Sequence, residues 1–272
     1  MKFAICNETF QGWEWEATCR YVAEAGYDGI EIAPFTLAED VRSIDSAERS
    51  AIRATAERAG LDVVGLHWLL VSPKGLSMTT ADAAIRRATS EYVSALADFC
   101  GDVGGRIMVF GSPAQRRIAE GDTRETAEAR FVEALRPALD RAAERGITVC
   151  LEPLPAPEAN YLLTLSEAVA LMKRLDHPAV KTIFDVKSAS SEGVPLPDLI
   201  AEYAPYIAHV HANDANRRGP GFGDTAFRPV LAALDRAGYD GFVSVEVFDY
   251  SPDPRTIATE SLRYLRECAP AR

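Results

Sequence analysis

The chain has 272 residues, of which 47% are hydrophobic and 25% charged, and its formal net charge is −11 at pH 7. This is an ordinary globular composition, and the acidic balance argues against a general nucleic-acid or anionic-membrane surface, which needs clustered Lys and Arg. No apolar run approaches the roughly 18 residues that span a bilayer, and the N-terminus lacks the features of a signal peptide. We therefore expect a cytoplasmic protein with no nucleic-acid or membrane partner.

Short β-rich segments alternate with helical stretches from one end of the chain to the other. Each of eight strand candidates is followed by a stretch with helical spacing or rich in Ala, Glu and Arg. The candidates are residues 2–6, 29–33, 62–67, 106–110, 147–152, 180–185, 206–211 and 242–246. Eight such pairs favour a closed parallel barrel over a doubly wound sheet, and no GxGxxG follows the first strand. We predict an α/β protein, a single (β/α)8 TIM barrel over residues 1–272.

Two identical Ala-Gly-Tyr-Asp-Gly segments, at residues 25–29 and 237–241, support the boundaries of these elements. Each begins where a helical stretch ends and leads into a strand. A glycine in the left-handed conformation is a common end for a helix, so we expect Gly26 and Gly238 to adopt it.

Four strands in the second half of the chain end in a carboxylate or an imidazole: Glu152, Asp185, His211 and Glu246. In a parallel barrel the downstream ends of the strands meet at one rim, so these side chains can surround a single point. Buried carboxylates repel one another unless a cation lies among them. Mixed oxygen and nitrogen ligands suit one divalent metal ion, and Mn²⁺, Co²⁺, Mg²⁺ and Zn²⁺ all remain open.

Three further polar or aromatic side chains, His209, His67 and Trp68, lie near the downstream ends of the predicted strands. His209 and His211 alternate and therefore face the same side of their strand at different depths. His211, nearer the rim, is the better metal ligand, whereas His209 suits a hydrogen-bonding layer below it. His67 and Trp68 follow the third strand and are candidates to stack on a sugar and donate a hydrogen bond; a packed Trp beside a hydrogen-bonded His is an equal alternative.

These motifs resemble those of the xylose isomerase-like TIM-barrel superfamily, and within it the sugar phosphate isomerase/epimerase group that includes the ketose 3-epimerases. The resemblance covers essentially the whole chain. Its segments are Gly-Ile-Glu31-Ile-Ala-Pro, Glu152-Pro-Leu, Asp185, His211-Ala-Asn-Asp-Ala-Asn-Arg-Arg-Gly-Pro-Gly and Val245-Glu246. It implies a metal-dependent enzyme with a small carbohydrate substrate, favours Mn²⁺ as the ion, and allows a homo-oligomer.

The resemblance also implies residue roles. The four strand-end residues match the metal ligands of the ketose 3-epimerases, and Glu152 and Glu246 match the pair that acts as acid and base on opposite faces of the substrate. Glu158 matches a glutamate that supports the first of these, and Arg217 an arginine that binds a substrate oxygen.

One position departs from the family pattern. The Asp-x-x-His of strand six reads Asp185-Val-Lys-Ser188 here, so Ser188 stands in place of a histidine that contacts the substrate. Serine is shorter and cannot be cationic, which leaves space for a larger or differently oxidised substrate. This departure argues against simple epimerisation of a free ketose.

We expect an isomerase or epimerase that acts on a ketose, keto-sugar or sugar phosphate through an enediolate, with one glutamate removing a proton and the other returning it. A lyase acting on a keto-glycoside or keto-cyclitol would use the same proton abstraction. An apurinic-site endonuclease would need more than the four histidines of this chain. A non-catalytic sugar-binding barrel would have no reason to place two potential bases at the metal.

Overall fold

The computed structural model describes residues 1–156 and 158–270. Eight parallel strands pair in chain order, and β8 pairs with β1 to close the barrel. The strands are β1 (Lys2–Cys6), β2 (Gly29–Ile32), β3 (Asp62–Leu66), β4 (Ile107–Phe110), β5 (Thr148–Leu151), β6 (Val180–Asp185), β7 (Ile207–Ala212) and β8 (Phe242–Val245). The predicted (β/α)8 barrel is confirmed, and each strand lies within one or two residues of its predicted bounds.

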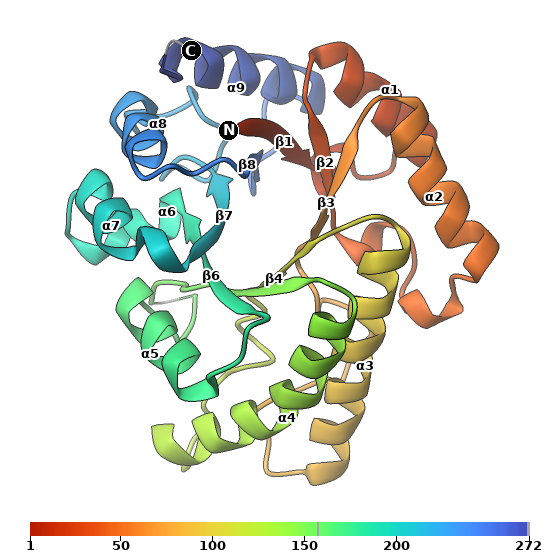
Figure 1. The fold of residues 1–272 in the computed structure, drawn as a ribbon, viewed down its shortest axis with the longest axis vertical. Helices are drawn as coiled ribbons and strands as arrows, with labels where there is room; N and C mark the ends of the chain where they lie inside the picture. The colour runs from red at the N-terminus through yellow and green to blue at the C-terminus, as the bar shows by residue number, and fades with distance from the viewer. Residues whose placement is uncertain (157, 271–272) are drawn as a thin grey trace.

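Helices surround this barrel on the outside (Figure 1). They are α1 (Trp15–Ala25), α2 (Ser46–Arg58), α3 (Ala83–Asp102), α4 (Arg124–Glu144), α5 (Leu165–Leu175), α6 (Val186–Ala189), α7 (Leu196–Tyr203), α8 (Phe227–Arg236) and α9 (Pro254–Cys268). The very short α6 directly follows β6, and its first turn is capped by the Asp185 side chain, which accepts a hydrogen bond from the Ser188 amide.

Local sequence signals place the ends of several helices. Gly26 and Gly238 have φ of 100° and 73°, the left-handed conformation expected of them. At the start of α2 the Asp45 side chain accepts from backbone amides while the Glu48 side chain accepts from the Asp45 amide, which is a complete capping box. These signals fix where the chain turns back toward the next strand.

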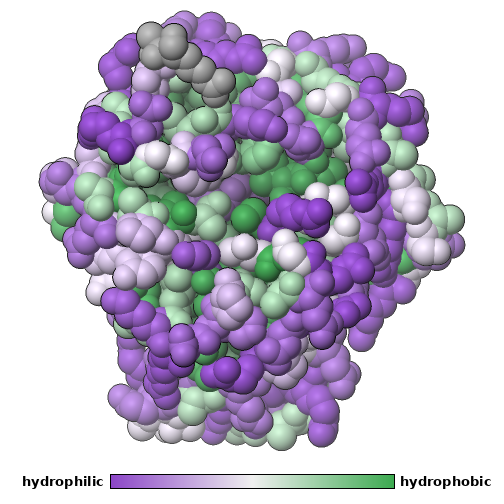
Figure 2. All heavy atoms as spheres, viewed as in Figure 1, coloured by the Kyte–Doolittle hydropathy of each residue, from purple (hydrophilic) through white to green (hydrophobic). Residues whose placement is uncertain are grey.

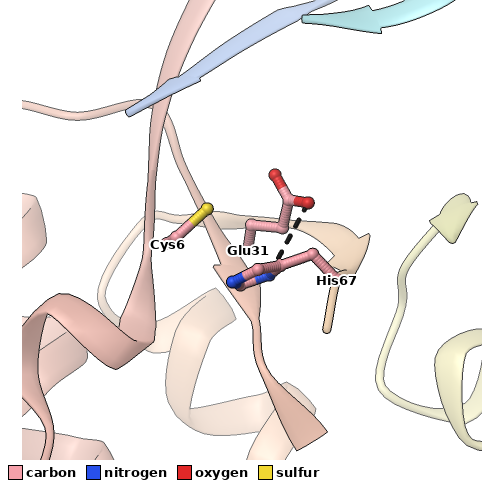
Figure 3. A group of neighbouring side chains, drawn as sticks. All are labelled: Cys6, Glu31 and His67. Carbon is pink, nitrogen blue, oxygen red and sulfur yellow. Dashed lines mark ion pairs between the residues drawn. The ribbon is translucent and has the colours of Figure 1, made fainter. Parts of the chain in front are cut away.

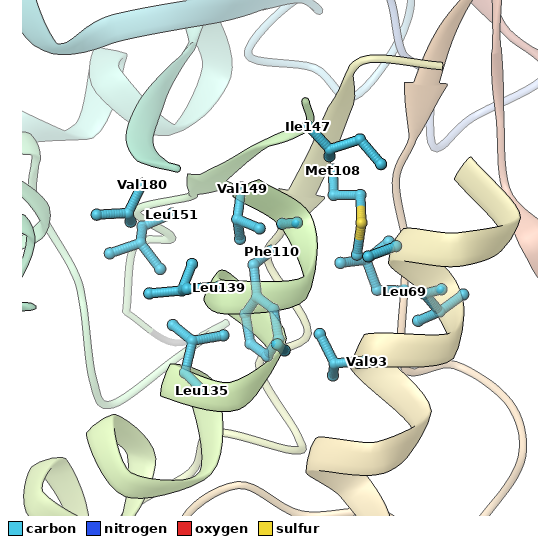
Figure 4. Close-up of a cluster of buried hydrophobic side chains, with 14 of the residues drawn as sticks. Leu69, Val93, Met108, Phe110, Leu135, Leu139, Ile147, Val149, Leu151 and Val180 are labelled. Atoms are coloured by element: carbon cyan, nitrogen blue, oxygen red, sulfur yellow. The ribbon is translucent and has the colours of Figure 1, made fainter. Parts of the chain in front are cut away.

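The apolar core lies mainly between the barrel wall and its helices. Figure 4 shows one part of it, where side chains of β4 and β5 meet those of α3 and α4. Its labelled residues are Leu69, Val93, Met108, Phe110, Leu135, Leu139, Ile147, Val149, Leu151 and Val180, all of them buried. The barrel interior, by contrast, contains buried imidazoles and carboxylates at the downstream ends of the strands.

Hydrophilic residues cover most of the face shown in Figure 2, and hydrophobic residues show mainly toward its middle. Among the described residues, every helix is too short or too polar to cross a bilayer.

Candidate metal centre

The structure brings the four strand-end side chains together at one rim of the barrel. Glu152 directly follows β5, Asp185 ends β6, His211 lies in β7 and Glu246 directly follows β8. One ligand atom from each lies within 4.8 Å of the others, and all four side chains are buried. The convergence expected from their positions at the strand ends is therefore present.

The imidazole of His211 faces two of these carboxylates. Its Nδ1 lies 3.2 Å from Oε2 of Glu246 and 3.8 Å from Oε1 of Glu152. Among the described residues this buried nitrogen has no hydrogen-bond partner of acceptable geometry. An imidazole nitrogen without a hydrogen-bond partner, beside three carboxylates, is a donor set that suits a divalent metal ion, so these residues fit the ion that the sequence predicts.

Burial and mutual repulsion shift the pKa values of the carboxylates in this cluster. Burial, together with the charges of Glu246 and Asp185, raises the pKa of Glu152 to about 7. Burial and then Glu246 raise the pKa of Asp185. Burial also opposes ionisation of Glu246, but His211 and the Trp68 indole outweigh it, and its pKa lies below the ordinary value. Such a cluster is short of positive charge, which a bound cation would provide.

Asn213 holds two of the carboxylates in place, and the sequence did not single it out. Its amide nitrogen donates to Oδ2 of Asp185 at 2.6 Å and approaches Oε2 of Glu246 at 3.3 Å. Its carbonyl oxygen accepts from the amide of Lys187 at 2.9 Å. Asn213 lies two residues beyond His211 and so faces the same side of the chain, a spacing that could have identified it.

Two residues of the loop after β4 set the position of Glu152, and neither was predicted. The fully buried Arg116 donates to the backbone carbonyl of Glu152 at 2.7 Å. Burial lowers the pKa of Arg116 to about 10. Gly111 follows β4, and a Cβ added there would overlap Oε2 of Glu152. No pattern distinguishes Arg116 from the other arginines of the chain, but a glycine directly after a strand is a recognisable sign of close approach.

A cavity of about 380 Å³ opens beside the cluster. Glu152 and Glu246 line it, together with an aromatic wall in which Trp68 stacks on Phe248 with ring centres 6.1 Å apart. The indole Nε1 of Trp68 also donates to Oε1 of Glu246 at 2.9 Å. Trp68 thus takes part both in the pocket wall and in the hydrogen bonding of a carboxylate, and it does so with φ of 52°, unusual for a residue with a side chain.

The family model of the xylose isomerase-like TIM barrel matches residues 19–268. The chain belongs to this family. It is 28% identical over 253 residues to D-psicose 3-epimerase of Agrobacterium fabrum (strain C58 / ATCC 33970), which covers 87% of this chain and 82% of that protein. It is 25% identical over 282 residues to 3-dehydro-D-guloside 4-epimerase of Escherichia coli (strain K12), covering 98% and 100%. A crystal structure of a D-psicose 3-epimerase in the presence of D-fructose superposes with a TM-score of 0.85 at 23% identity, covering 98% and 99%.

Three residues matched to substrate-binding positions of the family lie in or near the cavity. Glu158 lines it and forms an ion pair with Lys187 at 2.7 Å. The guanidinium carbon of Arg217 lies 5.6 Å from the ring centre of Phe248, one of the lining residues. Ser188 is buried beside Asp185, and its hydroxyl has no hydrogen-bond partner among the described residues.

His67 lies behind the wall of the cavity. It was a candidate for the pocket wall beside Trp68, but its side chain is fully buried and its Nε2 is 2.7 Å from Oε2 of Glu8. Both residues follow the end of β3 at Leu66, and Trp68 adopts a left-handed φ of 52°, so His67 lies inside the barrel while Trp68 lines the cavity. Of the two alternatives for His67, this position behind the pocket wall corresponds to the hydrogen-bonded one.

His67 belongs to a buried polar layer beneath the metal ligands. Figure 3 shows it beside Cys6 and Glu31, and its Nδ1 lies 3.7 Å from Oε1 of Glu31. His209 joins the same layer, since its Nε2 is 2.8 Å from Oε2 of Glu31. The expectation that His209 lies in a hydrogen-bonding layer below His211 agrees with this geometry.

This layer also contains groups of residues that could bind a metal ion, but their side chains are hydrogen-bonded to one another. Glu8 and His67 are hydrogen-bonded to each other, and Glu31 is hydrogen-bonded to His209 and His211, so an ion would have to break these bonds to enter. Burial raises the pKa of the Cys6 thiol to about 12, which keeps it protonated and a poor ligand. The strand-end cluster is therefore the better metal site of this family member.

Proposed function

We propose that this member of the family is a divalent-metal-dependent sugar isomerase or epimerase that acts on a ketose, keto-sugar or sugar phosphate. The observation that carries the proposal is that Glu152 and Glu246 belong both to the ligand cluster and to the lining of the cavity. The names of the two relatives, a ketose 3-epimerase and a 3-dehydro-glycoside 4-epimerase, support the same class of reaction. We place the enzyme in the cytoplasm, without a nucleic-acid or membrane partner, and the resemblance to the family allows a homo-oligomer.

Glu152, Asp185, His211 and Glu246 would hold the ion, with Mn²⁺ our favoured assignment. When bound, it would supply a Lewis acid for the carbonyl and neighbouring hydroxyl oxygens of the substrate. His211 contributes a neutral nitrogen, and the carboxylates contribute negative charge. Asn213 holds Asp185 and Glu246 apart at fixed positions through its amide group.

The two glutamates are suited to opposite proton-transfer roles. Glu246, with its lowered pKa, is the ionised member and can accept the proton from the carbon beside the carbonyl. Before the ion binds, burial and the neighbouring carboxylates raise the pKa of Glu152 to about 7, so it is the more basic of the two glutamates and the better suited to carry a proton and return it from the other side of the substrate. Two acids whose surroundings push their pKa values apart form a general acid and base pair. Protonation at the same carbon from the opposite face gives epimerisation, and protonation at its neighbour gives isomerisation.

A lyase is the second candidate, and Ser188 is the observation that favours it. With Ser188 in place of the family histidine, the cavity can admit a substrate with a bulky or oxidised substituent. Loss of such a substituent from the carbon next to the deprotonated one would give elimination in place of epimerisation. Product analysis separates the two, because only the lyase releases a second molecule.

Proton exchange tests the proposal. We expect the wild-type protein with Mn²⁺, Co²⁺ or Mg²⁺ to incorporate deuterium from heavy water into a ketose, keto-sugar or sugar phosphate. Glu246→Gln should lower this exchange by roughly 10²- to 10⁴-fold, the usual contribution of a general base. The exposed helix residue Glu144 supplies a matched control, since Glu144→Gln leaves the cavity untouched. Unchanged exchange in Glu246→Gln, or no exchange in wild-type protein with metal bound, would contradict the proposal.

A further inference from the structure

Glu31 of β2 lies under the metal ligands and contacts two histidines of β7. The side chain is fully buried. Its Oε2 lies 2.8 Å from Nε2 of His209, and its Oε1 lies 3.1 Å from Nε2 of His211. The two oxygens of this carboxylate therefore contact one imidazole each, and in both rings the contacting atom is Nε2.

This arrangement determines which nitrogen of His211 carries hydrogen. An ionised carboxylate only accepts hydrogen bonds, so Nε2 of each ring must be the N–H donor. Although burial opposes it, the charges of Glu246 and Glu31 raise the pKa of His211 well above its ordinary value, so an incoming ion must displace a proton from the ring. The neutral imidazole that binds an ion has a single N–H, on Nε2, and its other nitrogen then carries a lone pair. For His211 that nitrogen is Nδ1, the buried atom that has no hydrogen-bond partner among the described residues and faces Glu246 and Glu152.

We infer that Glu31 is the positioning residue of the metal centre, which fixes the tautomer and the ring orientation of His211 so that Nδ1 is the atom offered to the ion. The inference rests on the proposed metal function. It gives a role to a carboxylate that neither binds the ion nor lines the cavity. A partner of this kind typically changes metal affinity by about 10- to 100-fold when it is replaced.

Glutamine at this position would keep the shape of Glu31 but not its bonding. The carboxylate accepts from two imidazoles at once, whereas an amide has one accepting oxygen and one donating nitrogen. In Glu31→Gln, one of the two imidazoles must therefore accept a hydrogen bond from the glutamine amide, through an Nε2 that carries no hydrogen. When His211 does so, its proton moves to Nδ1 and blocks the atom that faces the carboxylates.

The matched control is Glu8→Gln. Glu8 is also a buried carboxylate bonded to Nε2 of an imidazole in the same layer, but that imidazole is His67, and Glu8 has no hydrogen bond to His211. A general effect of removing buried charge should appear in both variants, whereas an effect on the tautomer of His211 should appear only in Glu31→Gln.

The experiment combines two measurements on the full chain. The protonated nitrogen of His211 is read from two-bond ¹⁵N–¹H correlations of ¹⁵N-histidine-labelled protein saturated with Mg²⁺, a diamagnetic ion, with signals assigned by single histidine substitutions. Mn²⁺ affinity is measured by titration. We expect the wild-type ring to be protonated at Nε2, Glu31→Gln to lose that single tautomer and bind Mn²⁺ about 10- to 100-fold more weakly, and Glu8→Gln to keep the tautomer.

A proton on Nδ1 of His211 in the Mg²⁺-bound wild-type protein would overturn the inference without any variant, so the test survives if Glu31→Gln fails to fold. An unchanged tautomer and affinity in Glu31→Gln would overturn it as well. Failure of the proposed function looks different, since the wild-type protein would then bind no divalent ion whatever the state of His211.

Discussion

Glu152 and Glu246 have the same side chain and share the same cluster, yet their surroundings move their pKa values in opposite directions. Glu246 accepts a hydrogen bond from the Trp68 indole and lies 3.2 Å from His211, which both favour its ionised form. Glu152 has a longer contact with His211, 3.8 Å, and the negative charges of Glu246 and Asp185 oppose its ionisation. The difference between the two glutamates thus arises from their neighbours.

Metal affinity should depend on pH because of Glu152. Its pKa in the folded, metal-free protein is about 7, above the ordinary value of 4.5, so below pH 7 an incoming ion must displace a proton from it. We expect Mn²⁺ affinity to fall at least about tenfold for each pH unit from 7 toward 5, since the ion must also displace a proton from His211, whose pKa lies well above its ordinary value. Titration calorimetry in buffers of different ionisation enthalpy would report the released proton. An affinity that stays constant over this range would contradict the assignment.

The same shift has a consequence for the stability of the metal-free protein. Between pH 4.5 and 7 the folded state keeps a proton on Glu152 that the unfolded chain releases. The contribution of this group is therefore fully present below about 4.5 and is lost as the pH rises through 7. Bound metal should remove this loss, because the ion takes the place of the proton.

Ser188 offers a direct test of substrate contact. Its buried hydroxyl has no partner among the described residues, and an unsatisfied buried hydroxyl costs about 1–3 kcal/mol. Ser188→Ala should leave the melting temperature unchanged or raise it. If the hydroxyl bonds a substrate oxygen, the same variant should raise KM by roughly 5- to 10-fold, the equivalent of about 1 kcal/mol. Steady-state kinetics and a melting curve measure both effects, and an unchanged KM would remove Ser188 from the substrate site.

The metal ligands could be predicted from the sequence because each ends an apolar strand, and the barrel brings such positions to one rim. Arg116 could not, because its contact with the Glu152 carbonyl depends on how the loop after β4 folds over β5. For His67 the sequence left two alternatives, the pocket wall and a hydrogen-bonded position behind it. It could not decide between them, because the left-handed conformation of Trp68, directly after His67, has no sequence signal.

At the scale of elements, the site depends on how closely β4 and β5 approach at their downstream ends. Gly111 follows β4 and leaves the space that the Glu152 carboxylate occupies. A larger residue at Gly111 would meet the end of the Glu152 side chain and not the backbone. The fold can therefore accept the substitution, whereas the Glu152 carboxylate must move.

Gly111→Ala should therefore separate stability from function. We expect the melting temperature to change little, while the displaced Glu152 carboxylate lowers both Mn²⁺ affinity and turnover by at least about tenfold. Gly121→Ala is not a suitable control because Gly121 has φ of 87° and would be strained by a side chain. Ala114→Ser, at another lining position without a steric conflict in the cluster, tests whether any change to this loop has the same effect. Equal losses in both variants would contradict the specific role of Gly111.

At the scale of the whole molecule, the eightfold alternation of strands and helices made the fold predictable, since few architectures accommodate it. The buried polar layer inside the barrel was harder to predict from the sequence. Glu31 was recognised only as part of a family motif, because its partners His209 and His211 are about 180 residues away in the chain. A single sequence contains no direct measure of such a distant pairing.

Bound metal should stabilise the molecule as a whole. A ligand at 100 times its dissociation constant adds about 2.7 kcal/mol to the free energy of unfolding, provided the unfolded chain does not bind it. For a chain of this length that corresponds to a rise in melting temperature of roughly 5 °C. Differential scanning calorimetry with Mn²⁺ and then with a chelator would show the shift and its reversal. Wild-type protein that binds Mn²⁺ without any shift would contradict a site formed only in the folded state.

The separation between an apolar layer outside the strands and a polar layer inside them has a consequence for protein engineering. Most of the hydrophobic stabilisation comes from contacts such as those between β4, β5, α3 and α4, which the reacting groups do not touch. Libraries confined to the pocket wall, at Trp68, Leu154 and Phe248, should therefore retain a high fraction of folded clones. Such a barrel is a favourable starting point for the laboratory evolution of new sugar specificities.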